Sequence, residues 1–172
     1  MLRVLCAGLF AAAMAILAGC DNKPKPSEFK GGHDHDHSDH NRKDALLEDF
    51  ELPLGMKAHA GLQAHLGAVD GNELDVFFES LDTDPKPLAI PDKAKVTARV
   101  TRKGDDVPKE VTFKPADKSE RKSDPNGMCS RFSAEVKWMK ADDTLTVTLT
   151  VDMDGKIKRV TFDNFVPKDR QH

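Results

Sequence analysis

Apolar and polar residues alternate strictly along much of the second half of this chain. In the clearest run, residues 144–151, apolar residues occupy the odd positions and threonines occupy the even positions. The same period of two recurs over residues 93–102 and 131–138. Because successive side chains of a β-strand point to opposite faces, this pattern predicts strands with one buried face and one face in water.

Shorter strand candidates bring the expected number to about seven; they cover residues 74–81, 110–114, 156–162 and part of 56–69. Asp154 and Gly155 lie between two candidates and predict a tight hairpin in which both residues take positive φ. Residues 115–127 are expected to form an exposed loop, and residues 44–50 at most one or two helical turns. We therefore expect an all-β fold, a small antiparallel β-sandwich over residues 44–172.

The first 19 residues are of a different kind. Arg3 is followed by an uncharged apolar run over residues 4–17, which is the pattern of an export signal. The run is slightly shorter than the ~20 residues that a membrane-spanning helix needs. It ends at Leu17-Ala18-Gly19-Cys20, and these four positions resemble the lipobox of bacterial lipoproteins. An ordinary signal peptide and an uncleaved anchor are the alternatives.

The lipobox resemblance implies that residues 1–19 are a lipoprotein signal peptide, that the chain is cleaved after Gly19, and that Cys20 is acylated. Several acyl chains hold a protein firmly on a membrane that it does not span. We therefore expect a lipid-anchored protein of the bacterial cell envelope that faces the periplasm. Asp21 resembles the signal that retains some of these lipoproteins at the inner membrane.

Residues 21–43 are almost all charged, Pro, Ser, Asn, Gly or His, and Phe29 is the single large apolar residue among them. Such a composition buries too little apolar surface to offset the entropy of ordering the backbone. We expect residues 20–43 to be a lipidated, disordered and flexible tether. Four of the seven histidines of the chain lie in it, between residues 33 and 40.

These histidines are interleaved with aspartates, and the arrangement predicts a site for a divalent transition metal. Neutral imidazole suits zinc, nickel and cupric copper, and a carboxylate coordinates the ion or orients an imidazole. The predicted ligands, with zinc expected first, are His33, Asp34, His35, Asp36, His37 and His40. A linker without further function, an expression tag and a pH sensor are the alternatives for this stretch.

Two more histidines, His59 and His65, lie six residues apart in the expected β-domain. In one straight strand they share a face but lie roughly 20 Å apart, which is too far to share one ion. If Gly61 makes a turn, the two imidazoles can meet, and His172 can join them in a second metal site. The alternative for all three is an ordinary histidine without a ligand role.

Other classes of function have little support in the sequence. The formal net charge is −3, so the chain lacks the basic character of a nucleic-acid-binding protein. There is no Gly-x-Ser-x-Gly motif, no phosphate-binding glycine loop and no His-Glu-x-x-His motif, so we do not expect an enzyme. Cys129 is expected to be a small buried hydrophobic residue.

The combination of lipobox, His/Asp tract and small β-domain resembles the His-rich exported lipoproteins of bacteria that accompany divalent-metal transport. The tract is similar in composition to the histidine-rich loops of periplasmic zinc-binding proteins. Residues 72–100 resemble uncharacterised domains found near heavy-metal efflux adaptors, through Glu73-Leu74-Asp75-Val76 and Pro87-Leu88-Ala89-Ile90-Pro91. The resemblance implies capture of metal at a membrane and its transfer to a metal transporter or other envelope protein. The alternative is an envelope protein-interaction module whose tract is only a linker.

Overall fold

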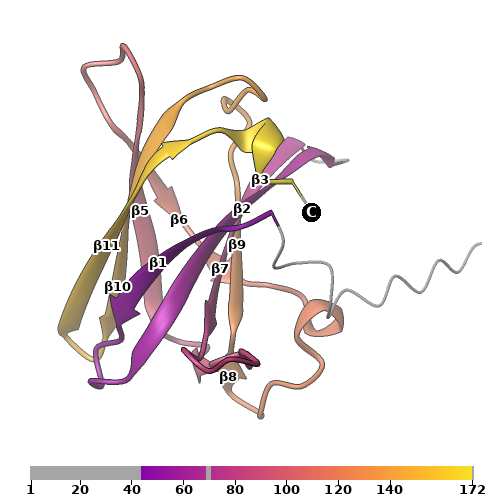
Figure 1. Ribbon diagram of the computed structural model, residues 1–172, viewed down its shortest axis with the longest axis vertical. Helices are drawn as coiled ribbons and strands as arrows, with labels where there is room; N and C mark the ends of the chain where they lie inside the picture. Colours follow the sequence, from indigo (N-terminus) through magenta and orange to yellow (C-terminus); the bar gives the residue numbers. More distant parts are fainter. Residues whose placement is uncertain (1–43, 69–70, 172) are drawn as a thin grey trace, which may run out of the picture. The chain divides into compact units, whose positions relative to one another are not determined.

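A computed structural model of the chain describes residues 44–68 and 71–171 (Figure 1). In this part the regular elements are β-strands and two short 3-10 turns, η1 (Lys118–Arg121) and η2 (Pro167–Asp169). The strands within each sheet pair in antiparallel fashion. The all-β class predicted from the alternating pattern is therefore confirmed.

The strands form two main sheets. Sheet 1 has the order β1 (Leu46–Glu51), β2 (Lys57–Ala68), β3 (Gly71–Glu79), β9 (Arg131–Glu135) and β7 (Lys114–Pro115). Sheet 2 has the order β11 (Lys156–Phe165), β10 (Leu145–Met153), β5 (Lys95–Arg102) and β6 (Lys109–Thr112). A small third pair consists of β4 (Ile90–Pro91) and β8 (Met128–Cys129).

The hydrophobic core lies between sheets 1 and 2 and is built from one face of each. Along β10 the apolar residues are buried and the residues between them are half-buried, as the period of two predicts. Sheet 1 contributes Phe78 and Phe132, whose ring centroids are 6.3 Å apart in an edge-to-face arrangement. The two antiparallel sheets thus bury a common core, which is the sandwich-like packing expected from the sequence.

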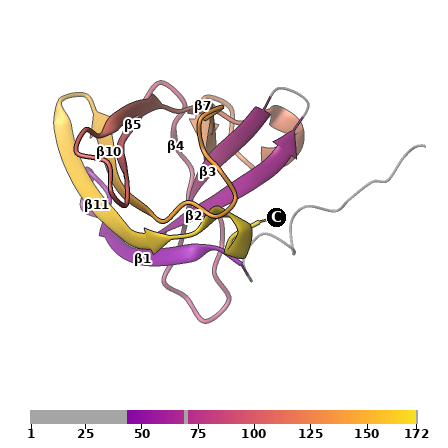
Figure 2. The same cartoon turned by 90° about the horizontal axis from the view of Figure 1, so that it is seen from above.

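The two sheets are connected along both sides (Figure 2). On one side the chain passes from β6 to β7 through Phe113, whose side chain is buried. On the other side β1 and β11 lie next to each other, and Lys158 Nζ donates to Glu51 Oε1 at 2.9 Å. β1 pairs with β2 only as far as Leu62, and beyond it the Ala64 N–H donates to the Arg170 carbonyl at 2.8 Å.

The predicted strands correspond to β2, β3, β5, β6, β9, β10 and β11. The predicted hairpin is also confirmed, because Asp154 and Gly155 connect β10 to β11 with φ of 52° and 83°. Residues 115–127 are mostly exposed, as expected, although they include the end of β7 and η1. The short pair of β4 and β8 was not predicted, since two residues are too few to show a period.

The prediction of helical turns at residues 44–50 is wrong, because residues 46–51 form β1. This strand pairs with β2 over its full length, from Leu46 opposite Leu62 to Glu51 opposite Lys57. Its sequence has no strict alternation, so local preference alone did not reveal it. The strand places the Phe50 ring in the core, stacked on Phe78 with centroids 6.0 Å apart. Tertiary packing therefore overrides weak local propensity here.

Candidate functional site

Two of the predicted metal ligands, His59 and His65, lie on β2 of sheet 1. β2 continues without a turn from Lys57 to Ala68, so the two histidines share a face but are six residues apart along it. The turn at Gly61 is not formed, and the structure does not bring the two imidazoles together. The other predicted site residues lie outside the described part of the chain: Cys20, His33, Asp34, His35, Asp36, His37, His40 and His172.

Gly61 has a packing role in the middle of β2. Its partner on β3 is Phe77, and the Phe77 ring lies so close that a Cβ at position 61 would overlap it. Glycine within a strand often marks such a close approach. Gly61 therefore allows Phe77 to lie across β2, and this explains why the residue that suggested a turn is part of a continuous strand.

His59 lies between two carboxylates on neighbouring strands. Asp49 is its partner on β1 and Glu79 is its partner on β3. The distance from His59 Nδ1 to Asp49 Oδ1 is 3.2 Å, which is ion-pair range but lacks hydrogen-bond geometry. His65 is exposed and opposes Glu73 of β3. In the described part of the sheet, each imidazole thus has acidic neighbours and no second imidazole beside it.

No three His, Cys, Asp or Glu side chains within residues 44–68 and 71–171 come close enough together to hold a metal ion. Catalytic zinc sites commonly use three protein ligands and structural ones use four. The described residues by themselves therefore provide no complete ligand set for one ion.

A buried ion pair connects two central strands of sheet 1. Arg131 on β9 donates from Nη2 to Asp75 Oδ2 on β3 at 3.0 Å, with the two side chains 7% and 3% exposed. Glu120 of η1 lies 3.7 Å from Arg131 Nε and brings the connection after β7 to the same guanidinium. Buried charges are tolerated when they are paired. We therefore assign this cluster a structural role, which the sequence analysis did not predict.

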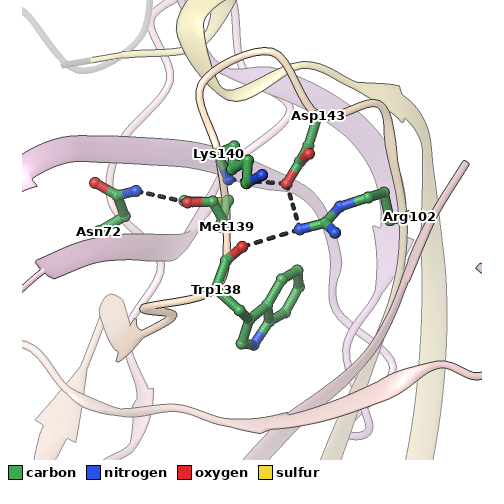
Figure 3. A network of polar contacts seen from close by, with 6 residues as sticks. All are labelled: Asn72, Arg102, Trp138, Met139, Lys140 and Asp143. Carbon is green, nitrogen blue, oxygen red and sulfur yellow. Dashed lines mark hydrogen bonds and ion pairs between the residues drawn. The ribbon is translucent and has the colours of Figure 1, made fainter.

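A second polar network closes the end of the sandwich at which β5 finishes (Figure 3). Arg102 Nη2 donates to the Trp138 carbonyl and to Asp143 Oδ2, both at 2.9 Å. The same carboxylate oxygen accepts the backbone N–H of Lys140 at 2.8 Å. These bonds fix residues 138–143, which connect β9 to β10, against the end of sheet 2.

The same segment is also bound to sheet 1. Asn72 of β3 donates from Nδ2 to the Met139 carbonyl at 2.6 Å (Figure 3). The half-buried Trp138 ring packs against the core, and Lys109 Nζ of β6 lies 4.4 Å from its centroid. A lysine over an indole face is attracted by the ring quadrupole. This network thus links both sheets through backbone carbonyls and one aromatic ring, so its role is also structural.

A polar cleft of about 320 Å³ lies at the same end of the domain. Typical small-molecule pockets are lined mainly by apolar and aromatic side chains. The lining of this cleft consists instead of hydroxyl, amide and charged residues with one glycine: Thr101, Arg102, Lys103, Gly104, Asp105, Thr144, Thr146 and Asn164. Its lining therefore differs from that of a typical small-molecule pocket.

The Cys129 side chain is fully buried in the hydrophobic core, as the sequence predicted. Its Sγ donates to the Arg131 carbonyl at 2.7 Å. Burial raises the pKa of the Cys129 thiol, and the hydrogen bond to Arg131 only partly opposes this. Since the thiolate is the reactive form, a raised pKa leaves this cysteine inert at neutral pH.

Comparison with known proteins gives no assignment. No family model, no curated protein and no solved structure matches this chain. Among the described residues there is no helix with the length and apolar character needed to span a membrane.

Proposed function

We propose that this chain is a membrane-anchored extracytoplasmic lipoprotein that binds and buffers a divalent transition metal, with zinc first and nickel or copper next. One observation carries the proposal: residues 33–40 contain four histidines and three aspartates in eight positions. Imidazole and carboxylate together suit borderline divalent ions such as zinc. We call this segment the metal tract.

The spacing within the metal tract supports coordination by several imidazoles at once. His33, His35 and His37 alternate with Asp34 and Asp36, so an extended backbone presents the three rings on one side. Where the backbone bends, the interleaved carboxylates can accept hydrogen bonds from these imidazoles or add further ligands. Ordering the backbone reduces the affinity, so the bound metal exchanges rapidly, as buffering requires.

In this proposal the β-domain supports the metal tract and does not itself supply the metal ligands. Support comes from the described residues, where no three metal-ligating side chains gather and where the carboxylates of Asp75 and Asp143 are bound to arginines. After residues 1–19 the chain has 25 Lys and Arg against 29 Asp and Glu, a net charge of −4. A negative protein raises the local concentration of cations.

The membrane anchor gives metal binding its location. The lipobox-like Leu17-Ala18-Gly19-Cys20 supports acylation of Cys20 and retention on an envelope membrane. His33 and His40, the ends of the metal tract, are 13 and 20 residues after Cys20. A metal ion bound between them therefore stays near the bilayer. A metal transporter or another envelope protein would receive the ion there, and the proposal involves no catalysed reaction.

Calorimetric titration of residues 21–172 with zinc, nickel and copper at about pH 7.5 tests metal binding. The tract variant replaces His33, His35, His37 and His40 by Asn, and the control replaces His59 and His65 by Asn. We expect binding in the micromolar range or tighter for the parent and the control, and none for the tract variant. At about pH 5.5 the parent should release its metal, because protonated imidazoles are not ligands.

Other outcomes would change the assignment in defined ways. Metal binding that survives in the tract variant would move the site into the β-domain, with His59, His65 and His172 as the first candidates. Absence of binding in every chain would make the tract a linker and favour an envelope protein-interaction module. The anchor is tested separately by the mass of the mature amino terminus and by release of a Cys20→Ser chain from membranes.

A further inference from the structure

Five large apolar side chains of the described domain are well exposed, and four of them lie at one end. Leu54 and Met56 lie in the β1–β2 turn, Leu81 in the loop after β3, and Ile157 at the start of β11, each between 40% and 59% exposed. The fifth, Val107, lies in the connection from β5 to β6 and is 74% exposed. We call the surface formed by the first four the apolar end.

Strand register places the three turns of the apolar end together. The pair His59–Glu79 puts the start of β2 beside the end of β3, so the β1–β2 turn adjoins the loop that contains Leu81. The ion pair of Glu51 with Lys158 places the β10–β11 hairpin next to the same turn. Figure 1 shows both hairpins at the lower end of the domain and the β5–β6 connection at the upper end.

The backbone at these turns is hydrogen-bonded within the protein. In the β1–β2 turn the N–H groups of Leu52 and Gly55 donate to the carbonyls of Met56 and Leu52, both at 2.8 Å. In the β10–β11 hairpin the Gly155 N–H donates to a side-chain carboxylate oxygen at 2.9 Å. Polar backbone groups that are already bonded do not oppose entry into a less polar layer.

Exposed lysines lie next to Met56 and Ile157, whereas the exposed residues after Leu81 include Asp82 and Asp84. Lys57 follows Met56 and Lys156 precedes Ile157, and both lysines are exposed. Two acidic groups nearby are paired with other lysines, since Glu51 Oε1 lies 2.9 Å from Lys158 Nζ and Asp154 Oδ1 lies 3.8 Å from Lys93 Nζ. Lysine stems can lie along apolar surface while the ammonium groups reach a phosphate.

We propose that the apolar end is a membrane-docking surface, where Leu54, Met56 and Ile157 enter the headgroup region of an anionic bilayer and the neighbouring lysines contact lipid phosphates. The inference rests on the proposed lipid anchor at Cys20. A stretch as long as residues 21–43 spans at most about 80 Å when fully extended, enough for either end of the domain to face the bilayer. The domain's own surface therefore decides which end does so.

A bilayer suits this surface better than a protein partner does. The apolar side chains lie on three separate turns, and exposed lysines adjoin Met56 and Ile157 on two of them. Lipids adjust to each protruding turn independently, whereas a protein interface of standard size needs about 800 Å² of well-packed surface on each partner. Apolar side chains bind to bilayer interfaces, and lysines beside them add electrostatic attraction to anionic lipids.

The experiment uses the mature chain, acylated at Cys20, in vesicles of phosphatidylethanolamine and phosphatidylglycerol. Single variants Leu54→Cys, Ile157→Cys and Val107→Cys carry a nitroxide label, while the buried Cys129 stays unlabelled. Power saturation compares collisions with oxygen, which concentrates in lipid, and with chromium oxalate, which stays in water. Nickel reagents are avoided because the metal tract would bind them.

We expect labels at positions 54 and 157 to be accessible to oxygen and protected from chromium oxalate, and the label at 107 to show the reverse. Val107 is the matched control because it lies at the opposite end and is the most exposed of the five apolar side chains. Equal, water-like accessibility at all three positions would overturn the proposal. A label at 54 or 157 that is protected equally without vesicles would indicate a protein contact and would overturn it as well.

A second measurement tests membrane docking of the apolar end in a chain without the anchor. A Cys20→Ser chain is sedimented with the same vesicles, with and without Leu54→Ser and Ile157→Ser, and Val107→Ser is the control. We expect the paired substitution to weaken residual vesicle binding about tenfold and the control to leave it unchanged. Residual binding that is absent, or equal in all chains, would contradict docking, whereas loss of acylation in the parent would contradict only the anchor.

Discussion

Each of the two sheets has an arginine–carboxylate pair on neighbouring strands, and the two pairs differ chiefly in burial. In sheet 1 Arg131 and Asp75 are 3.0 Å apart and are 7% and 3% exposed. In sheet 2 Arg99 and Glu110 are 3.2 Å apart and are 63% and 69% exposed. Water can solvate an exposed charge that loses its partner, but it cannot solvate a buried one. The same chemical pair is therefore required for the stability of sheet 1 and nearly dispensable in sheet 2.

The largest expected effect comes from breaking the buried pair. Asp75→Asn should lower the free energy of unfolding by about 3–5 kcal/mol, because it leaves the Arg131 charge buried without its main partner. Urea unfolding followed by Trp138 fluorescence measures this change. Replacing Asp75 by Leu and Arg131 by Met together should restore most of the loss. A decrease below about 1 kcal/mol in the single variant would show that burial does not distinguish the two sheets.

A second difference is that sheet 1 has a glycine inside a strand, Gly61, with a ring lying across it, whereas the strands of sheet 2 contain no glycine. Gly61→Ala should destabilise the domain by about 1–3 kcal/mol, because its Cβ would displace the Phe77 ring that lies across β2. Thermal unfolding measures the loss, and Gly61→Ala combined with Phe77→Leu should recover part of it. If Gly61→Ala alone proved neutral or stabilising, the ring would have to be free to move.

The exposed pair of sheet 2 should respond weakly to the same kind of change. Glu110→Gln should alter the free energy of unfolding by less than about 1 kcal/mol, because Arg99 becomes hydrated when its partner is neutral. The urea titration used for Asp75→Asn gives a direct comparison. A loss as large as that of Asp75→Asn would mean that geometry, and not burial, controls the strength of these pairs.

A third pair links the two sheets and should have the smallest effect, visible only as a pH dependence. The hydrogen bond and charge of Lys158 hold the pKa of Glu51 below its ordinary value of 4.5. The contribution of this pair is therefore complete above about pH 4.5 and is lost as the pH falls through the lower folded-state value. Melting temperatures from pH 7 to pH 3 should fall less steeply for Lys158→Met than for the parent, and identical slopes would contradict the linkage.

The period of two was sufficient to predict most strands but not their surroundings. It identified the buried face of β10 because that assignment depends only on the alternation within one segment. It missed β1, whose strand conformation depends on pairing with β2 and on packing of Phe50. It also gave no indication that Asp75 and Arg131 are buried, because alternation reports which side a residue faces and not what covers that side.

The candidate metal ligands show the same limit in a different form. The chemistry of residues 33–40 can be inferred from composition, since a dense run of imidazoles and carboxylates has metal affinity without a fixed fold. For His59 and His65, a decision required knowing whether Gly61 turns, and that depends on the Phe77 ring of the next strand. The spacing of residues along one segment does not reveal such a contact between strands.

The hydrogen bond between Ala64 and Arg170 also affects how the chain reaches its folded state. The two residues are more than a hundred positions apart, yet this bond pairs the part of the β2 edge that β1 leaves open. Contacts between distant residues form slowly, and until then an unpaired strand edge can associate with other chains. A nascent chain that ends before residue 170 cannot protect this edge, so correct folding has to wait for synthesis to pass it. Such a delay would suit the export proposed above for this chain, in which the chain crosses a membrane before it folds.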